Sequence, residues 1–174
     1  NWRLEMAFVI ENSTVVSFAE YSDVLLQDQR LFEVNEGLSD DVVEPLLVRA
    51  TERILTKLRT SSWWRSYFRD RNTSVAISTV ADIPALNPNY IELRQTDFTE
   101  LCVYVAPADY ILPSIADFSN QETAERQKMG YYTNRADALF AELVEAGDWY
   151  DWDNSGTVTT TERTPGLINL KRVR

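Results

Sequence analysis

Apolar residues recur at helical spacing along much of this chain, and this pattern predicts a mainly α fold. A first helix is expected to begin after Ser17 and to end at Gly37. Ser17 and Glu20 have capping-box spacing, and glycine favours the end of a helix. The apolar positions of this helix are Phe18, Tyr21, Val24, Leu25 and Phe32.

A second helix is expected to begin at residues 39–41, where Ser39, Asp40 and Asp41 offer acceptors and negative charge at the helix N-terminus. Pro45 lies early enough to be tolerated in the first turn. The polar face of this helix is basic, which is typical of either a nucleic-acid-binding face or a solvated face paired with nearby acids. The acidity of the whole chain favours the second interpretation. The apolar stripe is Val43, Leu46, Leu47, Ala50, Ile54 and Leu58, and the basic face is Arg49, Arg53, Lys57 and Arg59.

Two further helices complete a predicted small helical bundle with long loops. Residues 99–118 are strongly apolar and indicate a buried helix, which Pro107 and Pro113 break or kink. Residues 120–146 predict the longest helix, which Gly147 ends.

The remaining central part, residues 70–96, is rich in loop-forming residues and is expected to be irregular. A short strand is predicted there through Val75, Ile77 and Val80. Just before this loop, four aromatic residues fall within six positions. Such a cluster is typical of a core plug at a helix end, or of an anchor in a subunit interface. The candidate interface residues are Trp63, Trp64, Tyr67 and Phe68.

Composition narrows the possible functions. Net charge is -10, which disfavours binding to a phosphate backbone, and hydrophobic residues make up 44% of the chain, enough for a core. The chain has no histidine and one cysteine, Cys102, so histidine-based catalysis, cysteine zinc sites and an internal disulfide are excluded. The remaining acids show no catalytic pairing, and we expect no enzyme. No apolar run approaches the roughly 20 residues that span a bilayer, and no membrane association is expected.

The most specific motif is a stretch of twelve residues, 151–162, that fits the calcium-binding loop of an EF-hand. Alternate residues place oxygen atoms on one side of the loop, glycine at the sixth position allows the sharp turn, and a glutamate closes the site. An acidic turn without a metal ion is the alternative. The predicted Ca²⁺ ligands are Asp151, Asp153, Ser155, Thr157 through its carbonyl, Thr159 and Glu162.

This loop lacks a complete helix-loop-helix setting. Gly147 ends the entering helix before Asp151, and Pro165 and Gly166 follow Glu162 too soon for a regular exit helix. With three carboxylates the affinity for Ca²⁺ is expected to be modest, about 10⁻⁵ to 10⁻³ M. The motif therefore predicts a structural clip in preference to a calcium sensor.

The chain after the loop is basic and partly apolar, which indicates either a frayed tail or an extended arm that docks on an acidic partner or a neighbouring subunit. Three parts are thus predicted: an N-terminal segment 1–12, a helical bundle domain 13–148, and a calcium-type loop with a C-terminal docking arm 149–174. The candidate partner-binding residues are Arg163, Leu167, Ile168, Leu170, Lys171, Arg172, Val173 and Arg174.

Several of these segments together resemble the head-tail adaptor proteins of tailed bacteriophages, also called connector, head-completion or neck proteins. The likeness is one of pattern and covers most of the chain from about residue 8. It is carried by residues 18–23 (FAEYSD), by 50–55 (ATERIL) running into Trp63 and Trp64, by 135–140 (RADALF) and by the C-terminal arm.

The resemblance implies a structural virion protein without catalytic residues, made in the host cytoplasm and located at the head-tail junction. It implies a ring, typically of twelve copies, that docks on the portal protein through the arm and also meets tail or further neck proteins. The ring extends the channel toward the tail, and DNA passes through it without sequence-specific binding. The alternative is a calcium-binding protein-interaction module without catalytic activity.

Overall fold

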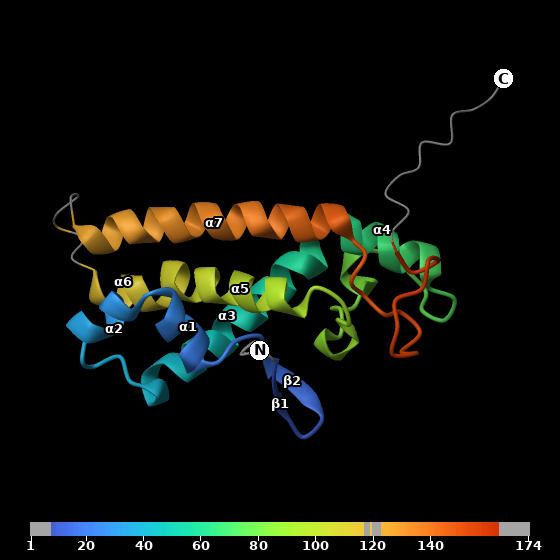
Figure 1. The fold of residues 1–174 in the computed structure, drawn as a ribbon. Coiled ribbons are helices and arrows are strands. Elements are labelled where there is room, and N and C mark those ends of the chain that lie inside the picture. The colour runs from blue at the N-terminus through green and yellow to red at the C-terminus, as the bar shows by residue number, and fades with distance from the viewer. Residues whose placement is uncertain (1–7, 117–118, 120–122, 164–174) are drawn as a thin grey trace.

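The computed structural model describes residues 8–116, 119 and 123–163. The chain folds mainly into helices, as the apolar periodicity predicts, with one small hairpin near its start (Figure 1). Two long helices, α3 (Asp40–Thr60) and α7 (Ala124–Ala146), both pack against the buried helix α5 (Gln95–Ala106). Among the described residues, no helix combines the length and the apolar character that a membrane crossing needs.

The hairpin joins β1 (Val9–Glu11) to β2 (Thr14–Ser17) through two residues with positive φ, Asn12 at 50° and Ser13 at 61°. Positive φ at both central positions is typical of a type I′ turn, one of the two turn types that two-residue hairpins favour. The side chain of Asn89, in the turn η2 (Pro88–Tyr90), holds this hairpin. Its Oδ1 accepts from the backbone N–H of Val15 at 2.8 Å and its Nδ2 donates to the carbonyl of Ser13 at 3.1 Å.

The predicted first helix is wrong in its start and its continuity. Ser17 ends β2, and Glu20 is the N-cap of α1 (Tyr21–Gln27), with Asp23 accepting from the Glu20 N–H at 2.8 Å. The helix ends at Asp28, and α2 (Gln29–Val34) follows with a new direction. Asp28 caps α2 by accepting from Leu31 N, and its carboxylate also accepts from two residues of α7. These are Lys128 (Nζ, 2.8 Å) and Tyr132 (hydroxyl, 3.0 Å).

The second predicted helix is confirmed as α3, which begins after Ser39. Pro45 is its sixth residue and therefore lies in the second turn, one turn later than expected. On the basic face, Arg49 lies over the ring of Tyr110, Lys57 forms an ion pair with Asp137 at 3.7 Å, and Arg59 donates to the carbonyl of Ile83. Lys57 thus meets an acid, as the interpretation of a solvated face paired with acids expects, whereas Arg49 meets a ring and Arg59 a carbonyl.

The predicted buried helix 99–118 is present but is not one regular α-helix. It begins earlier, at Gln95, and α5 passes through a π-helical turn, η3 (Pro107–Ile111), into α6 (Leu112–Ile115). A proline cannot donate a backbone hydrogen bond and crowds the preceding turn, and the wider π turn at Pro107 absorbs both effects. In this continuation Pro107, Ala108, Ile111 and Leu112 are buried, whereas Asp109 and Ser114 are exposed.

The predicted longest helix is confirmed as α7, and it ends at Gly147 in the left-handed conformation, with φ 53°. The start of the predicted range, 120–122, lies outside the described residues. Helix α4 (Ser62–Arg71) follows α3 after one residue and packs beside the end of the bundle (Figure 1).

The predicted strand at Val75, Ile77 and Val80 is wrong. The Asn72 side chain makes a local turn with Ser74 and Val75, and a short 3-10 helix, η1 (Val80–Asp82), follows. No partner strand lies beside this segment in the described chain, so its apolar residues have no sheet to pack in. Val75 and Val80 are both exposed.

Candidate metal centre

The calcium-type loop is attached to the bundle by the residues that precede it. Trp149 is fully buried and its indole N–H donates to the carbonyl of Leu143, near the end of α7, at 2.8 Å. Tyr150 pairs with Ile91 in an isolated antiparallel bridge, and the N–H of Asp151 donates to the carbonyl of Tyr90 at 2.8 Å. The first residue of the loop is therefore fixed both to α7 and to the chain that enters α5.

An aromatic cluster on α4 forms the floor under the loop. Trp152, the second loop residue, packs against Phe68, Tyr67 and Trp64, with ring centroids 5.6, 5.9 and 6.4 Å apart. Val158, the eighth residue of the loop, is also buried. Burial raises the pKa of Tyr67, whose hydroxyl donates to the carbonyl of Tyr150 at 3.4 Å.

The four aromatic residues that the sequence offers as interface anchors are buried inside a single chain. Trp63 is 8% exposed and Trp64, Tyr67 and Phe68 are less exposed still. They form a core plug along α4, just after the end of α3, and a core plug at a helix end is one of the two interpretations of the cluster. Their role in a subunit contact stays a prediction, and it would have to use the little surface that remains.

Inside the loop, the Asp151 carboxylate is oriented by backbone donors. Its Oδ2 accepts from the N–H of Gly156 at 2.8 Å and its Oδ1 from the N–H of Ser155 at 3.2 Å. Gly156 has φ 86°, a conformation that glycine adopts without strain. The turn that the glycine allows is thus the turn that presents its N–H to the first carboxylate.

The Glu162 carboxylate closes the loop from the opposite end. Its Oε1 accepts from the N–H of Asp153 at 3.0 Å, and its Oε2 accepts from both the N–H and the hydroxyl of Thr159, at 2.7 and 2.9 Å. Glu162 is 5% exposed although it carries a carboxylate. A buried carboxylate requires compensating donors or a cation, and the three hydrogen bonds supply part of that compensation.

These contacts bring three of the six predicted ligand residues into one group. One carboxylate oxygen from each of Asp151, Asp153 and Glu162 lies within 4.8 Å of the others, and such a group could hold a metal ion. Asp151 and Glu162 are buried and Asp153 is exposed. Hydrogen bonding from Ser155 lowers the pKa of Asp153, so this carboxylate is ionised at neutral pH. Carboxylate oxygens gathered this closely would attract a cation.

The other three predicted ligands, Ser155, Thr157 and Thr159, also form hydrogen bonds inside the loop. The Ser155 hydroxyl donates to the carbonyl of Thr157 at 3.1 Å, and the Thr159 hydroxyl donates to Glu162. In each of these pairs two predicted ligand oxygens are hydrogen-bonded to each other. All of the predicted metal ligands are oxygen atoms.

One residue of this site was not predicted from the sequence. The Arg71 guanidinium, at the end of α4, donates to the carbonyls of Thr161 at 2.9 Å and Glu162 at 3.4 Å. The same group lies 3.7 Å from the centre of the Tyr67 ring, in cation-π geometry. Ninety positions of sequence separate Arg71 from Thr161, and no local pattern links them.

The loop ends in a single turn in which Glu162 and Arg163 both donate from their backbone N–H groups to the carbonyl of Thr159. The described chain reaches Arg163, one residue past the loop, so the predicted lack of an exit helix concerns residues outside the described part. Of the candidate partner-binding residues, Arg163 is described. The others lie outside the described residues: Leu167, Ile168, Leu170, Lys171, Arg172, Val173 and Arg174.

Comparisons with protein-family models, with curated proteins and with solved structures find no match to this chain.

Proposed function

We propose that this chain is a structural virion protein of a tailed bacteriophage, which forms a ring at the head-tail junction and docks on the portal through its C-terminal segment. In this proposal the loop 151–162 binds a structural Ca²⁺ ion, and DNA passes through the ring toward the tail. The sequence resemblance to head-tail adaptors supports the assignment, and the mainly helical fold is compatible with it.

The observation that carries the proposal is the place of the carboxylate loop. It lies between the end of the bundle and the basic segment that starts at Arg163, and Arg71 and the α4 aromatic cluster hold it on the bundle. A cation bound by Asp151 and Glu162 would connect the two ends of the loop. The direction in which the following segment leaves the bundle would then be set by the ion.

The chemistry of the predicted metal ligands favours Ca²⁺ among common cations. Carboxylate, hydroxyl and carbonyl oxygens suit a hard cation, and the chain has no histidine and only a buried cysteine elsewhere to attract a softer metal. An irregular loop tolerates the variable coordination of Ca²⁺ better than the strict octahedron of Mg²⁺.

The charge of the chain fits passage of DNA. With a net charge of -10, the surfaces of a ring would repel phosphates, so DNA could move through without being held. The basic segment after Glu162 has the opposite sign, and it would suit an acidic surface on a partner.

Calcium binding is tested by thermal unfolding of the full chain, with excess Ca²⁺ or with EDTA. At Ca²⁺ a hundredfold above the Kd, linkage gives about 2.7 kcal/mol of stabilisation. That corresponds to a rise in Tm of about 5–10 °C for a chain of this size. The change Glu162→Gln should abolish the calcium response, whereas Glu142→Gln, at an exposed site on α7, should keep it. An equal response in the two variants would reject the metal site.

The assembly is tested by electron microscopy of the protein mixed with purified portal. Ring-shaped density on the portal is the expected result, and a variant truncated after Arg163 should lose it. Free protein and bare portal particles in the wild-type mixture would contradict the docking proposal.

A calcium-binding interaction module without a viral role is the second candidate, and the organised loop in a single chain favours it. The loop carboxylates already accept hydrogen bonds from their own backbone, so metal binding needs no assembly. This candidate predicts a partner whose binding depends on Ca²⁺. The portal experiment discriminates between the two, because only the first candidate predicts a ring on the portal.

A further inference from the structure

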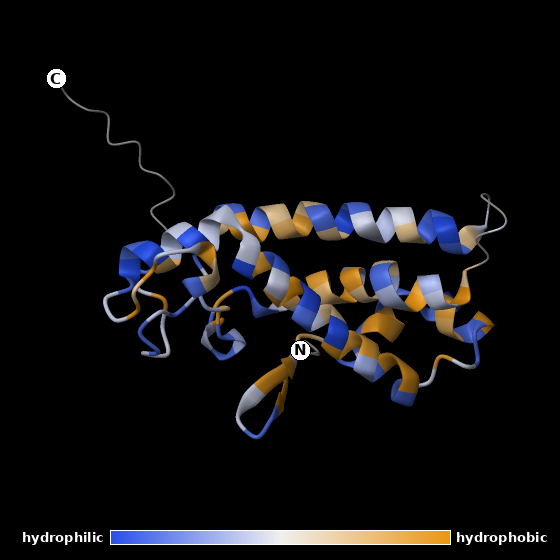
Figure 2. Ribbon diagram, turned by 180° about the vertical axis from the view of Figure 1, so that it is seen from behind, coloured by the Kyte–Doolittle hydropathy of each residue, from blue (hydrophilic) through white to orange (hydrophobic). Residues whose placement is uncertain are grey.

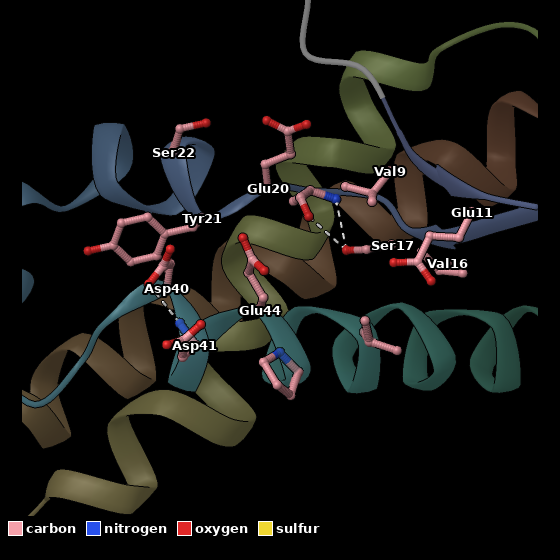
Figure 3. A pocket seen from close by; sticks show the side chains of 13 residues that line it. Val9, Glu11, Val16, Ser17, Glu20, Tyr21, Ser22, Asp40, Asp41 and Glu44 are labelled. Atoms are coloured by element: carbon pink, nitrogen blue, oxygen red, sulfur yellow. Dashed lines mark hydrogen bonds between the residues drawn. The ribbon is translucent and has the colours of Figure 1, made fainter.

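A groove of about 870 Å³ lies on the N-terminal side of the molecule, away from the loop. The hairpin β1–β2, the start of α1 and the first turns of α3 form its walls. Figure 3 shows Glu44 projecting from α3 toward the chain that joins β2 to α1, with Asp40 and Asp41 to one side and Glu11 to the other. The groove plays no part in the metal centre.

The lining combines apolar surface with concentrated negative charge. The strands of the hairpin are hydrophobic in Figure 2, and Val9 and Val16 face the groove together with Pro45 and Val48. No lysine or arginine is among the described lining residues, and none of the lining carboxylates forms an ion pair with another described residue. The five lining acids, all exposed, are Glu11, Glu20, Asp40, Asp41 and Glu44.

The C-terminal segment of the same chain has the complementary composition. Residues 163–174 contain four basic and no acidic side chains, and apolar residues stand between them. An extended peptide of this kind can place apolar side chains in a groove while its cations meet the acidic rim. The basic residues are Arg163, Lys171, Arg172 and Arg174, and the apolar ones are Leu167, Ile168, Leu170 and Val173.

We propose that this acidic groove binds the segment 164–174 of a second copy of the chain. Charge complementarity carries the inference, together with the apolar lining that a wholly electrostatic contact would not need. The proposed contact between copies does not depend on the head-tail proposal.

The reach of the segment argues for a second copy. Thr161 and Glu162, shortly before the segment, are held by Arg71 at the end of α4, whereas the groove follows the first turns of α3 from Asp40 to Val48. The rest of α3, from Val48 to Thr60, alone spans about 18 Å at 1.5 Å per residue. Eleven extended residues reach at most about 40 Å. A chain folding back on itself would use about half of the segment to cross α3, so few residues would remain for the groove.

Such a contact is heterologous, because the segment of one copy enters the groove of the next. Repetition of a heterologous contact gives a closed ring or an open filament. If the portal also takes the segment, the two sites compete for it, and portal binding would weaken the contact between copies.

The test is a charge swap in the full chain, followed by sedimentation velocity. Wild-type protein should associate with rising concentration, and added salt should weaken that association. The groove variant Glu11→Lys with Glu44→Lys and the segment variant Lys171→Glu with Arg172→Glu should each stay monomeric. An equimolar mixture of the two should associate again, because each supplies the charge that the other has lost. The control Glu142→Lys with Glu145→Lys raises the net charge by the same amount as the groove variant, but at exposed sites on α7. It should associate as the wild type does.

A second measurement uses a fluorescent peptide with the sequence of residues 163–174. Its anisotropy should rise on titration with the segment variant, whose groove is intact and whose own segment no longer competes. Adding the two groove substitutions to that variant should weaken peptide binding at least about tenfold. Equal affinity for both proteins would overturn the proposal, as would self-association of the groove variant at the wild-type level. A peptide that binds purified portal but not this chain would overturn the groove contact and leave portal docking intact.

Discussion

At the scale of single residues, the carboxylate loop 151–162 depends on side chains that hold its backbone in place. Arg71 is the clearest case, because it binds the carbonyls of Thr161 and Glu162 while its guanidinium stacks on Tyr67. Its charge also lies near a loop with three carboxylates. Arg71 therefore positions the loop although it is not one of the predicted metal ligands.

We expect Arg71→Met to lower the free energy of unfolding by about 1–2 kcal/mol, because two hydrogen bonds to a charged group are lost. It should also reduce the gain in Tm on adding Ca²⁺, since Glu162 is no longer held from α4. Chemical denaturation with and without Ca²⁺ measures both effects. Arg69→Met is the matched control, because Arg69 pairs with exposed Asp70 and should matter by less than about 0.5 kcal/mol. If both variants lose equal stability, Arg71 has no special role at the loop.

At the scale of elements, the helices differ in what sets their limits. Local chemistry ends α7, where Gly147 adopts the left-handed conformation. Tertiary contacts help to end α1, where Asp28 leaves the helical conformation and binds Lys128 and Tyr132 on α7. The π turn at Pro107 shows a third case, in which the helical path continues past a proline, with buried Val105 before it and buried Ile111 after it.

Gly130 offers a prediction at this scale. It lies in the interior of α7, it is exposed, and a Cβ added there would meet nothing within 4 Å. Gly130→Ala should therefore stabilise the protein by about 1 kcal/mol, because alanine loses less backbone entropy in a helix. Thermal unfolding should show a rise in Tm of about 2–4 °C. The reverse exchange at an exposed site of the same helix, Ala138→Gly, should lower Tm by a similar amount. A fall in Tm for Gly130→Ala would mean that α7 is not helical at that position.

At the scale of the whole molecule, one hydrophobic core runs from the hairpin to the residues that enter the carboxylate loop. Phe8 packs on Phe18, Phe18 on Phe98, and Phe98 on Trp149, which carries the chain into the loop. A second connection is ionic: the Arg94 guanidinium binds both oxygens of Asp148, at 2.7 and 3.1 Å. This pair joins the start of α5 to the chain that leaves α7.

The ion pair predicts a dependence of stability on pH. The Arg94 guanidinium lowers the pKa of the Asp148 carboxyl in the folded state. A depressed folded pKa stabilises the protein above the unfolded value, near 3.9, and this contribution is lost as the pH falls through the folded pKa. Both side chains are partly exposed, so we expect a contribution of about 1 kcal/mol or less at pH 7. Asp148→Asn should be less stable than wild type at pH 7, and the difference should shrink below about pH 4. A difference that stays constant over this range would exclude the ion pair as its cause.

The sequence by itself determined the features whose causes act over a few residues. The apolar periods of α3, α5 and α7, the stop at Gly147 and the spacing of Asp151, Asp153 and Glu162 all follow from local rules of helix geometry, capping and ligand alternation. The two turn residues of the hairpin also lie in the local sequence, but Asn12 and Ser13 are not the glycine-containing pair that usually marks such a turn.

Only the tertiary structure decided the contacts between distant parts of the chain. The break at Asp28 depends on α7, the hairpin is held by Asn89, and the loop is held by Arg71 from ninety positions away. The acidic groove likewise arises because β1, α1 and α3 meet in space, although its carboxylates are scattered from Glu11 to Glu44. Periodicity and spacing describe neighbours along the chain, whereas these contacts follow from packing of the whole core.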